Sequence, residues 1–186
     1  MKKYELTSET KVFNDVELHR IKALKSFGNI KEGYLGGWIE SEKNLSQDVG
    51  AWIGENAAVF ENARIFGNAT IRGNATVGGN AEVYGNAMVC ETATVGGDAT
   101  VGGYAKVGGD ATVRKTADFI VFKNWWSSGR YFTWTRSNNK WSVGCFYGSG
   151  EELIAKAYKD SEKSGREYER VVKYVESILK EKNNNK

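Results

Sequence analysis

The middle of the chain repeats a phrase of six residues, as in NATVGG at positions 74–79. Alanine recurs at every sixth position from Ala51 to Ala117, and an apolar residue follows two positions later, from Ile53 to Phe119. A helix would space apolar residues three or four positions apart, and a two-sided sheet every second position. The twelve phrases therefore predict a series of short strands, each followed by a bend.

Three phrases, or 18 residues, close one triangular coil, and coils stack about 4.8 Å apart through strand pairing. We expect each valine or isoleucine to point inward and each alanine to fill a corner. Gly and Asn tolerate the positive φ that such corners demand. Residues 18 positions apart then lie above one another, which predicts a stack of Phe66 on Tyr84 and an ion pair between Arg64 and Glu82.

The segment before the repeats is expected to cap the open end of the coil. Residues 4–27 suggest strands around an Asn14-Asp15 turn, and residues 35–39 begin a first, irregular coil. Without such a cap, a solenoid exposes strand edges and core. These features predict an N-terminal β cap at residues 1–34 and a β-helix of about four regular coils at residues 35–121.

The segment after the repeats is expected to hold a β-hairpin and two helices. Tyr131–Arg136 and Trp141–Tyr147 flank a Ser-Asn-Asn-Lys turn. The S-x-x-E pairs that begin at Ser149 and Ser164 match the capping box that starts many helices. The predicted boundaries are residues 122–148 for an aromatic-rich hairpin and residues 149–186 for the helices.

The hexads resemble those of the hexapeptide-repeat superfamily, whose fold is the left-handed parallel β-helix. The resemblance implies the left hand, since general crossover rules favour the right. The flanks TSETKVFNDVELHRIKALKSFGNIKEGYLGGWIESEKNLS (7–46) and SVGCFYGSGEELIAKAY (142–158) resemble small hexapeptide-repeat proteins of phages and prophages. That group mostly lacks an assigned activity. Hexapeptide-repeat proteins commonly form trimers, so the resemblance also implies a homotrimer.

Basic and aromatic residues concentrate between positions 119 and 150. The whole chain has 26 basic and 23 acidic residues, but this segment has four basic residues and no Asp or Glu. Two interpretations remain open: the aromatics anchor a small module, or they stack on nucleotide bases while cations neutralise phosphate. The candidates for binding a ligand or partner are Trp125, Trp126, Arg130, Trp134, Arg136 and Trp141.

The stacked positions Thr76, Thr94 and Thr112 predict a flat outer face of small residues. Threonine is common on exposed strands because it suits the pleated surface. Alternatively, this face packs on another subunit or on the chain's own C-terminal helices. We take these three threonines as the candidate oligomer face.

Catalytic chemistry has weak support in the sequence. Many hexapeptide-repeat enzymes are acyltransferases that act on CoA thioesters and use a histidine base. The one histidine here, His19, falls in the N-terminal cap. Cys90 is expected to face outward and Cys145 to pack in the hairpin, both as reduced thiols. No metal site, cofactor or catalytic residue is predicted.

The best functional interpretation is a non-enzymatic phage or prophage accessory protein. It would bind a host macromolecule or a nucleotide-like anionic ligand, and the resemblance suggests a role in countering host defence. The alternatives are a CoA-dependent acyltransferase and a structural virion or assembly component. The sequence shows no secretion signal and no apolar run of about 20 residues, so we expect a location in the bacterial cytoplasm with no membrane partner.

Overall fold

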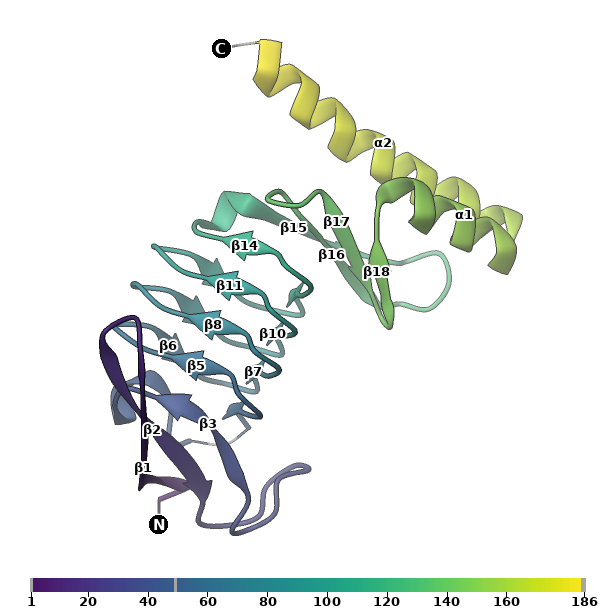
Figure 1. The fold of residues 1–186 in the computed structure, drawn as a ribbon. Helices are drawn as coiled ribbons and strands as arrows, with labels where there is room; N and C mark the ends of the chain where they lie inside the picture. Colours follow the sequence, from purple (N-terminus) through teal and green to yellow (C-terminus); the bar gives the residue numbers. More distant parts are fainter. Residues whose placement is uncertain (1, 49, 185–186) are drawn as a thin grey trace.

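The computed structural model describes residues 2–48 and 50–184. Its centre is a parallel β-solenoid, with an antiparallel hairpin at one end and an antiparallel sheet plus two helices at the other (Figure 1). The predicted mainly-β solenoid with about 18 residues per coil is therefore confirmed. Within the described part of the chain, no helix is both long and apolar enough to cross a bilayer.

After β3, the solenoid consists of two-residue strands on three sides, and each of them pairs with the strand 18 residues away, as in Thr76 with Thr94. The sheets have the orders β3-β5-β8-β11-β14, β4-β7-β10-β13 and β6-β9-β12. The strands are β3 (Leu35–Ile39), β4 (Trp52–Ile53), β5 (Ala58–Val59), β6 (Arg64–Ile65), β7 (Thr70–Ile71), β8 (Thr76–Val77), β9 (Glu82–Val83), β10 (Met88–Val89), β11 (Thr94–Val95), β12 (Thr100–Val101), β13 (Lys106–Val107) and β14 (Thr112–Val113).

The inside of the solenoid is a continuous apolar column. The second residue of each strand from β4 to β14 is at most 1% exposed, and the repeat alanines from Ala51 to Ala111 are equally buried. The first residue of most of these strands faces outward. The predicted division of each hexad into an inward aliphatic, a corner alanine and an outward position is confirmed.

The corners differ from the prediction in the role of asparagine. No repeat asparagine has a positive φ; the residue before it does, and that residue is a glycine, Glu55 or Glu61, while Glu91 has the same conformation before Thr92. The asparagine side chains instead form ladders along the solenoid, with Asn56 Nδ2 donating to Asn74 Oδ1 at 2.9 Å. Asparagine therefore contributes hydrogen bonds between coils, and the preceding residue makes the bend.

The three glutamates with positive φ each hydrogen-bond to the next coil. Glu55 Oε2 accepts from Gly73 N at 2.6 Å, and Glu91 Oε2 accepts from Gly109 N at 2.6 Å. Glu61 accepts from the backbone of Gly79 in the same way. Because a left-handed backbone costs a side-chain-bearing residue about 1–2 kcal/mol, these charge-assisted bonds offset part of the cost.

The N-terminal cap extends one side of the solenoid. Strands β1 (Tyr4–Phe13) and β2 (Val16–Ala23) pair around the predicted turn at Asn14 and Asp15, and both turn residues have positive φ. Strand β2 pairs with β3, and β3 pairs in parallel with β5, so this sheet has seven strands. A short 3-10 helix, η1 (Glu42–Asn44), follows β3.

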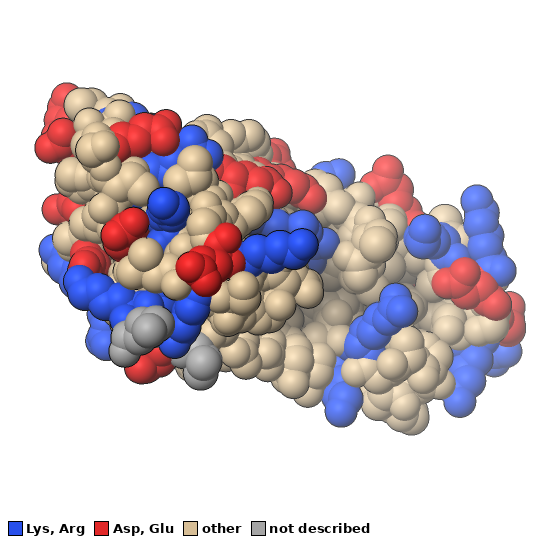
Figure 2. Space-filling view, turned by 90° about the horizontal axis from the view of Figure 1, so that it is seen from below, with Lys and Arg blue, Asp and Glu red and all other residues tan. Residues whose placement is uncertain are grey.

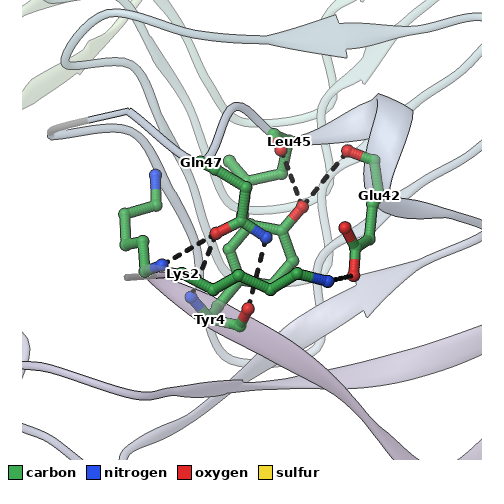
Figure 3. A network of polar contacts seen from close by, with 6 residues as sticks. Lys2, Tyr4, Glu42, Leu45 and Gln47 are labelled. Atoms are coloured by element: carbon green, nitrogen blue, oxygen red, sulfur yellow. Dashed lines mark hydrogen bonds and ion pairs between the residues drawn. The ribbon is translucent and has the colours of Figure 1, made fainter.

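A polar network closes the N-terminal end of the coil (Figure 3). The Tyr4 hydroxyl donates to Leu45 O at 2.7 Å, and the Gln47 amide exchanges hydrogen bonds with the Tyr4 backbone. Lys2 forms an ion pair with Glu42. These contacts attach the first strand to the segment that enters the first regular coil.

The C-terminal module is a larger sheet than the predicted hairpin. Strands β15 (Phe119–Lys123), β16 (Tyr131–Thr135), β17 (Lys140–Val143) and β18 (Phe146–Gly148) form an antiparallel sheet in chain order. The twelfth hexad does not continue the coil: η2 (Thr116–Asp118) replaces its corner and Ala117 is exposed. Asp118 Oδ2 accepts from the N–H groups of Arg114 and Lys115, which stabilises this change of direction.

Two helices follow the sheet: α1 (Gly150–Asp160) and α2 (Glu162–Asn184). The predicted capping box at Ser149 is confirmed, because Ser149 and Glu152 hydrogen-bond reciprocally. The start predicted with Ser164 as the cap is wrong by three residues, because α2 begins at Glu162 and the Ser161 hydroxyl accepts from Ser164 N. The last two residues of the expected helical segment, 185 and 186, lie outside the described residues.

Candidate ligand-binding groove between the solenoid and the C-terminal sheet

Three of the predicted binding tryptophans form the core of the C-terminal module. Trp126, Trp134 and Trp141 are 8%, 1% and 2% exposed. They pack with Phe132 and Tyr168 in a single apolar cluster, and Trp134 Nε1 donates to Asn139 Oδ1 at 2.8 Å. A ligand cannot stack on buried rings, so the predicted ligand-binding role of these three residues is wrong. They anchor the C-terminal module instead.

The remaining candidates lie in different places. Trp125 is 74% exposed and meets Trp126 edge to face, with ring centroids 6.1 Å apart. Arg130 is exposed and lines two concave regions of the surface. Arg136 is half-buried, and its backbone N–H donates to Asp118 O near the end of the solenoid. Of the six candidates, Arg130 is therefore the one that lines the two concave regions described below.

A groove of about 460 Å³ separates one side of the solenoid from the C-terminal sheet. We call it the tyrosine groove. Its solenoid wall comes from β10, β13 and the corner between β12 and β13, and its other wall comes from the segments before β16 and after β17. The residues that matter for its chemistry are Met88, Tyr104, Lys106, Arg130, Tyr131 and Gly144.

Two tyrosines from the two walls stack on each other. The rings of Tyr104 and Tyr131 are nearly parallel, 5° apart in plane, with centroids separated by 4.5 Å. Tyr104 is 52% exposed and Tyr131 is 37% exposed, and Lys123 Nζ lies 5.6 Å from the Tyr131 ring centre. The pair presents aromatic surface that stays open to solvent in a concave setting.

Hydrogen bonds to the C-terminal sheet hold Lys106 at the tyrosine groove. Lys106 Nζ donates to Gly144 O at 2.9 Å, and Lys106 N donates to Thr133 Oγ1 at 2.9 Å, which joins β13 to the C-terminal sheet. Among the described residues that line the groove, none is acidic. Lys106 and Arg130 therefore give the groove a positive potential that favours an anion.

The surface at the cap end carries charges of both signs. Figure 2 views the molecule along the solenoid from the cap end, and acidic and basic side chains are interleaved over that end. Exposed ion pairs such as Arg64–Glu82, with 3.3 Å between Nη1 and Oε1, confirm one predicted contact of this kind. Such pairs contribute little to stability and do not define a binding site.

The burial of the two cysteine thiols is the reverse of the prediction. Cys90 faces outward from the coil but is only 2% exposed, and burial raises the pKa of its thiol. The expectation that Cys145 packs in the hairpin is wrong, because this thiol is exposed. Both are free thiols, and the raised pKa makes Cys90 a poor nucleophile.

His19 lies far from the tyrosine groove. It sits on β2, opposite Thr10 and Ile39, at the cap end of the solenoid (Figure 1). The groove contains neither a histidine nor a carboxylate among its described lining residues, so it offers no general base of the kind an acyltransferase uses.

The outer threonine face has the predicted register. Thr76, Thr94 and Thr112 are directly paired, and the hydroxyls of Thr76 and Thr94 are 3.2 Å apart. The cap covers Ala58 at the start of this column, and the helices pack against β17 and β18. The alternative in which the chain's own helices cover these threonines is therefore wrong, and Thr94 is exposed.

The aromatic stack on another side of the solenoid is also confirmed. The rings of Phe66 and Tyr84 lie 5.2 Å apart and 6° from parallel.

Among the described residues, no grouping of three or more His, Cys, Asp or Glu side chains could hold a metal ion. Comparison with known proteins finds no matching family model and no matching curated protein.

Proposed function

We propose that this chain is a non-enzymatic binding protein that holds a nucleotide-like anion in the tyrosine groove. The observation that carries the proposal is the exposed Tyr104–Tyr131 pair, flanked by Lys106, Lys123 and Arg130. Any nucleobase can stack on an aromatic ring through its π-face, whichever base it is, and cations neutralise the phosphate of the nucleotide. The groove is present without a ligand, and paired strands form its solenoid wall, so little ordering opposes binding.

The biological setting follows from the resemblance of the flanking segments to small hexapeptide-repeat proteins of phages. We propose an accessory protein that acts in the bacterial cytoplasm and removes a nucleotide-like signal or contacts a host macromolecule, thereby countering host defence. The absence of a histidine or carboxylate from the described groove lining supports binding over CoA-dependent acyl transfer.

We further propose a homotrimer that uses the face of Thr76, Thr94 and Thr112. The support is a surface of small residues on which Thr94 is exposed and Thr76 and Thr112 are half-buried, with the groove of Gly78 and Gly96 beside it. Light scattering at micromolar concentration is expected to give three times the chain mass of 20.6 kDa. A single-chain mass would contradict this assembly.

The test of the binding function is titration calorimetry with AMP. Wild-type protein is expected to bind, and Tyr104→Ala is expected to weaken binding about 10-fold or more, because stacking on one aromatic contributes about 1–3 kcal/mol. The matched control is Tyr174→Ala, which removes a 58% exposed tyrosine from α2. Failure of the wild type to bind AMP at millimolar concentration, or equal affinity for Tyr104→Ala, would refute the proposal.

A further inference from the structure

A second cleft lies beside the tyrosine groove, under the two helices. Its volume is about 300 Å³, which is at the lower end for ligand pockets. The segment between β15 and β16 forms one wall, and α1, the start of α2 and the turn after β17 form the others. We call it the helix cleft.

Two hydroxyl-bearing side chains of α2, Ser164 and Tyr168, line the helix cleft and are 8% and 7% exposed. The Tyr168 hydroxyl oxygen accepts from Asn124 Nδ2 at 3.1 Å. A hydroxyl group can donate one hydrogen bond and accept two, so both groups can donate to an acceptor on a molecule bound in the cleft.

The other lining residues combine an apolar wall with a charged mouth. Val143, Phe146 and Leu153 provide the apolar surface, and exposed Lys156 and Asp160 lie at the rim. A flat heterocycle suits the apolar wall, and the hydroxyls of a sugar suit a rim that holds both a donor and a carboxylate.

Arg130 belongs to both cavities. It lines the tyrosine groove and the helix cleft, and a Cβ placed on Gly144 would lie 3.4 Å from Arg130 Nη1. The guanidinium thus lies against the turn where the two cavities meet, since Gly144 lines the groove and Cys145 lines the cleft. A guanidinium in this position can bind a phosphate through two parallel N–H donors.

We infer that the tyrosine groove and the helix cleft are two halves of one site for a dinucleotide. One nucleoside stacks on Tyr104, the phosphate that joins the two units binds Arg130, and the second nucleoside occupies the helix cleft against Ser164 and Tyr168. The inference rests on the proposed function, because it assigns the second half of the ligand whose first half the tyrosine groove holds.

The experiment compares AMP with the dinucleoside monophosphate ApA by titration calorimetry. Wild-type protein is expected to bind ApA at least about 10-fold more tightly than AMP, since a second base adds its own contacts. Ser164→Val and Lys156→Ala should remove most of that advantage and leave AMP affinity unchanged. Lys163→Ala, an exposed change in the same turn of α2, is the control and should behave as wild type.

The outcomes separate this inference from the proposed function. AMP binding that depends on Tyr104 with no advantage for ApA overturns the two-part site and leaves the proposed function standing. Absence of binding by either ligand overturns both. An ApA advantage that survives Ser164→Val and Lys156→Ala, in variants with unchanged thermal unfolding, also overturns the assignment of the helix cleft.

Discussion

Lys3 shows how much a single residue can depend on its surroundings. Its side chain is fully buried, and Nζ donates to Asp48 O at 2.8 Å and to Ala51 O at 2.9 Å. Burial lowers the pKa of Lys3 from 10.5 to about 8. Nothing in MKKYEL distinguishes Lys3 from its exposed neighbour Lys2, because both lie just before β1 and differ only in which of them is buried by contacts with residues 48–51.

The pKa of Lys3 predicts a pH-dependent stability. Between pH 8 and 10.5 the unfolded chain keeps a proton that the folded chain has released, so the free energy of unfolding rises with pH in this window. Relative to Lys3→Met, the wild type should gain on the order of 1–2 kcal/mol between pH 7.5 and 9.5 in urea unfolding.

Burial raises the pKa values of Cys90 and Tyr4, so their titrations change the free energy of unfolding in the opposite direction to that of Lys3. Comparing the wild type with Lys3→Met at each pH cancels these contributions. Lys2→Met is the control and should retain the wild-type dependence, since Lys2 is exposed. Equal pH dependence of the wild type and Lys3→Met would show that Lys3 does not titrate in this range.

Two corner glycines with the same φ of +65° provide a second test at the residue scale. A Cβ on Gly79 would lie 2.7 Å from the backbone N of Gly97, whereas a Cβ on Gly103 meets nothing within 4 Å. Gly103→Ala should cost about 1–2 kcal/mol for the left-handed backbone alone. Gly79→Ala should cost a further 1–3 kcal/mol or so for the clash. Thermal and urea unfolding measure both, and equal losses would argue against close stacking of the coils.

At the scale of the element, each short strand alternates between solvent and core. Thr94 is exposed and Val95 is fully buried, although the two are neighbours in β11. Thr94→Val should change the free energy of unfolding by less than about 0.5 kcal/mol. Val95→Thr should cost about 1–3 kcal/mol, because it buries a hydroxyl without a partner. A larger loss for Thr94→Val in urea unfolding would contradict this orientation.

The elements with a strict period were predicted well. The alanine and valine positions of the hexads fix which side of each strand faces inward, so the register follows directly. Prediction weakened at the end of the solenoid, where residues 114–118 keep the alanine of the repeat but lose its Gly or Asn corner. There Phe119 starts β15, because pairing with β16 outweighs the local pattern.

At the scale of the whole molecule, one polar cluster joins the solenoid to the C-terminal sheet. Asp110 Oδ1 accepts from the Tyr147 hydroxyl at 2.8 Å and from Asn138 Nδ2 at 2.9 Å. These hydrogen bonds lower the pKa of Asp110, and burial together with Asp110 raises the pKa of Tyr147 to about 12. The cluster positions the two walls of the tyrosine groove relative to each other.

Tyr147→Phe is therefore expected to loosen this junction. Trypsin cleavage near Arg114 and Lys115, which are exposed between the two parts, should accelerate about fivefold, as loss of roughly 1 kcal/mol of local stability implies. Tyr158→Phe is the control: it removes a tyrosine hydroxyl that bonds Glu169 within the helices, at 2.8 Å. An unchanged cleavage rate for Tyr147→Phe would show that apolar packing alone holds the junction.

The candidate site could be predicted only in part. Basic and aromatic enrichment between positions 119 and 150 indicated a region that supplies Arg130 and Tyr131 to the tyrosine groove, but it could not separate buried Trp134 and Trp141 from exposed Trp125. Tyr104 and Lys106 were missed because they lie inside the repeat, where the outward positions carry no local signal. A contact between β13 and the C-terminal sheet is what makes those positions part of a groove.

The sequence by itself determined the solenoid, because every coil repeats the same short-range pattern of strand, corner and stacking. A hexad that departs from this pattern is still placed by the regular hexads on either side of it. The tertiary structure alone decided the placement of the C-terminal sheet, the burial of Lys3 and Cys90, and the meeting of Tyr104 with Tyr131. These depend on contacts between residues far apart in the chain, whose free energies are set by packing and desolvation in three dimensions.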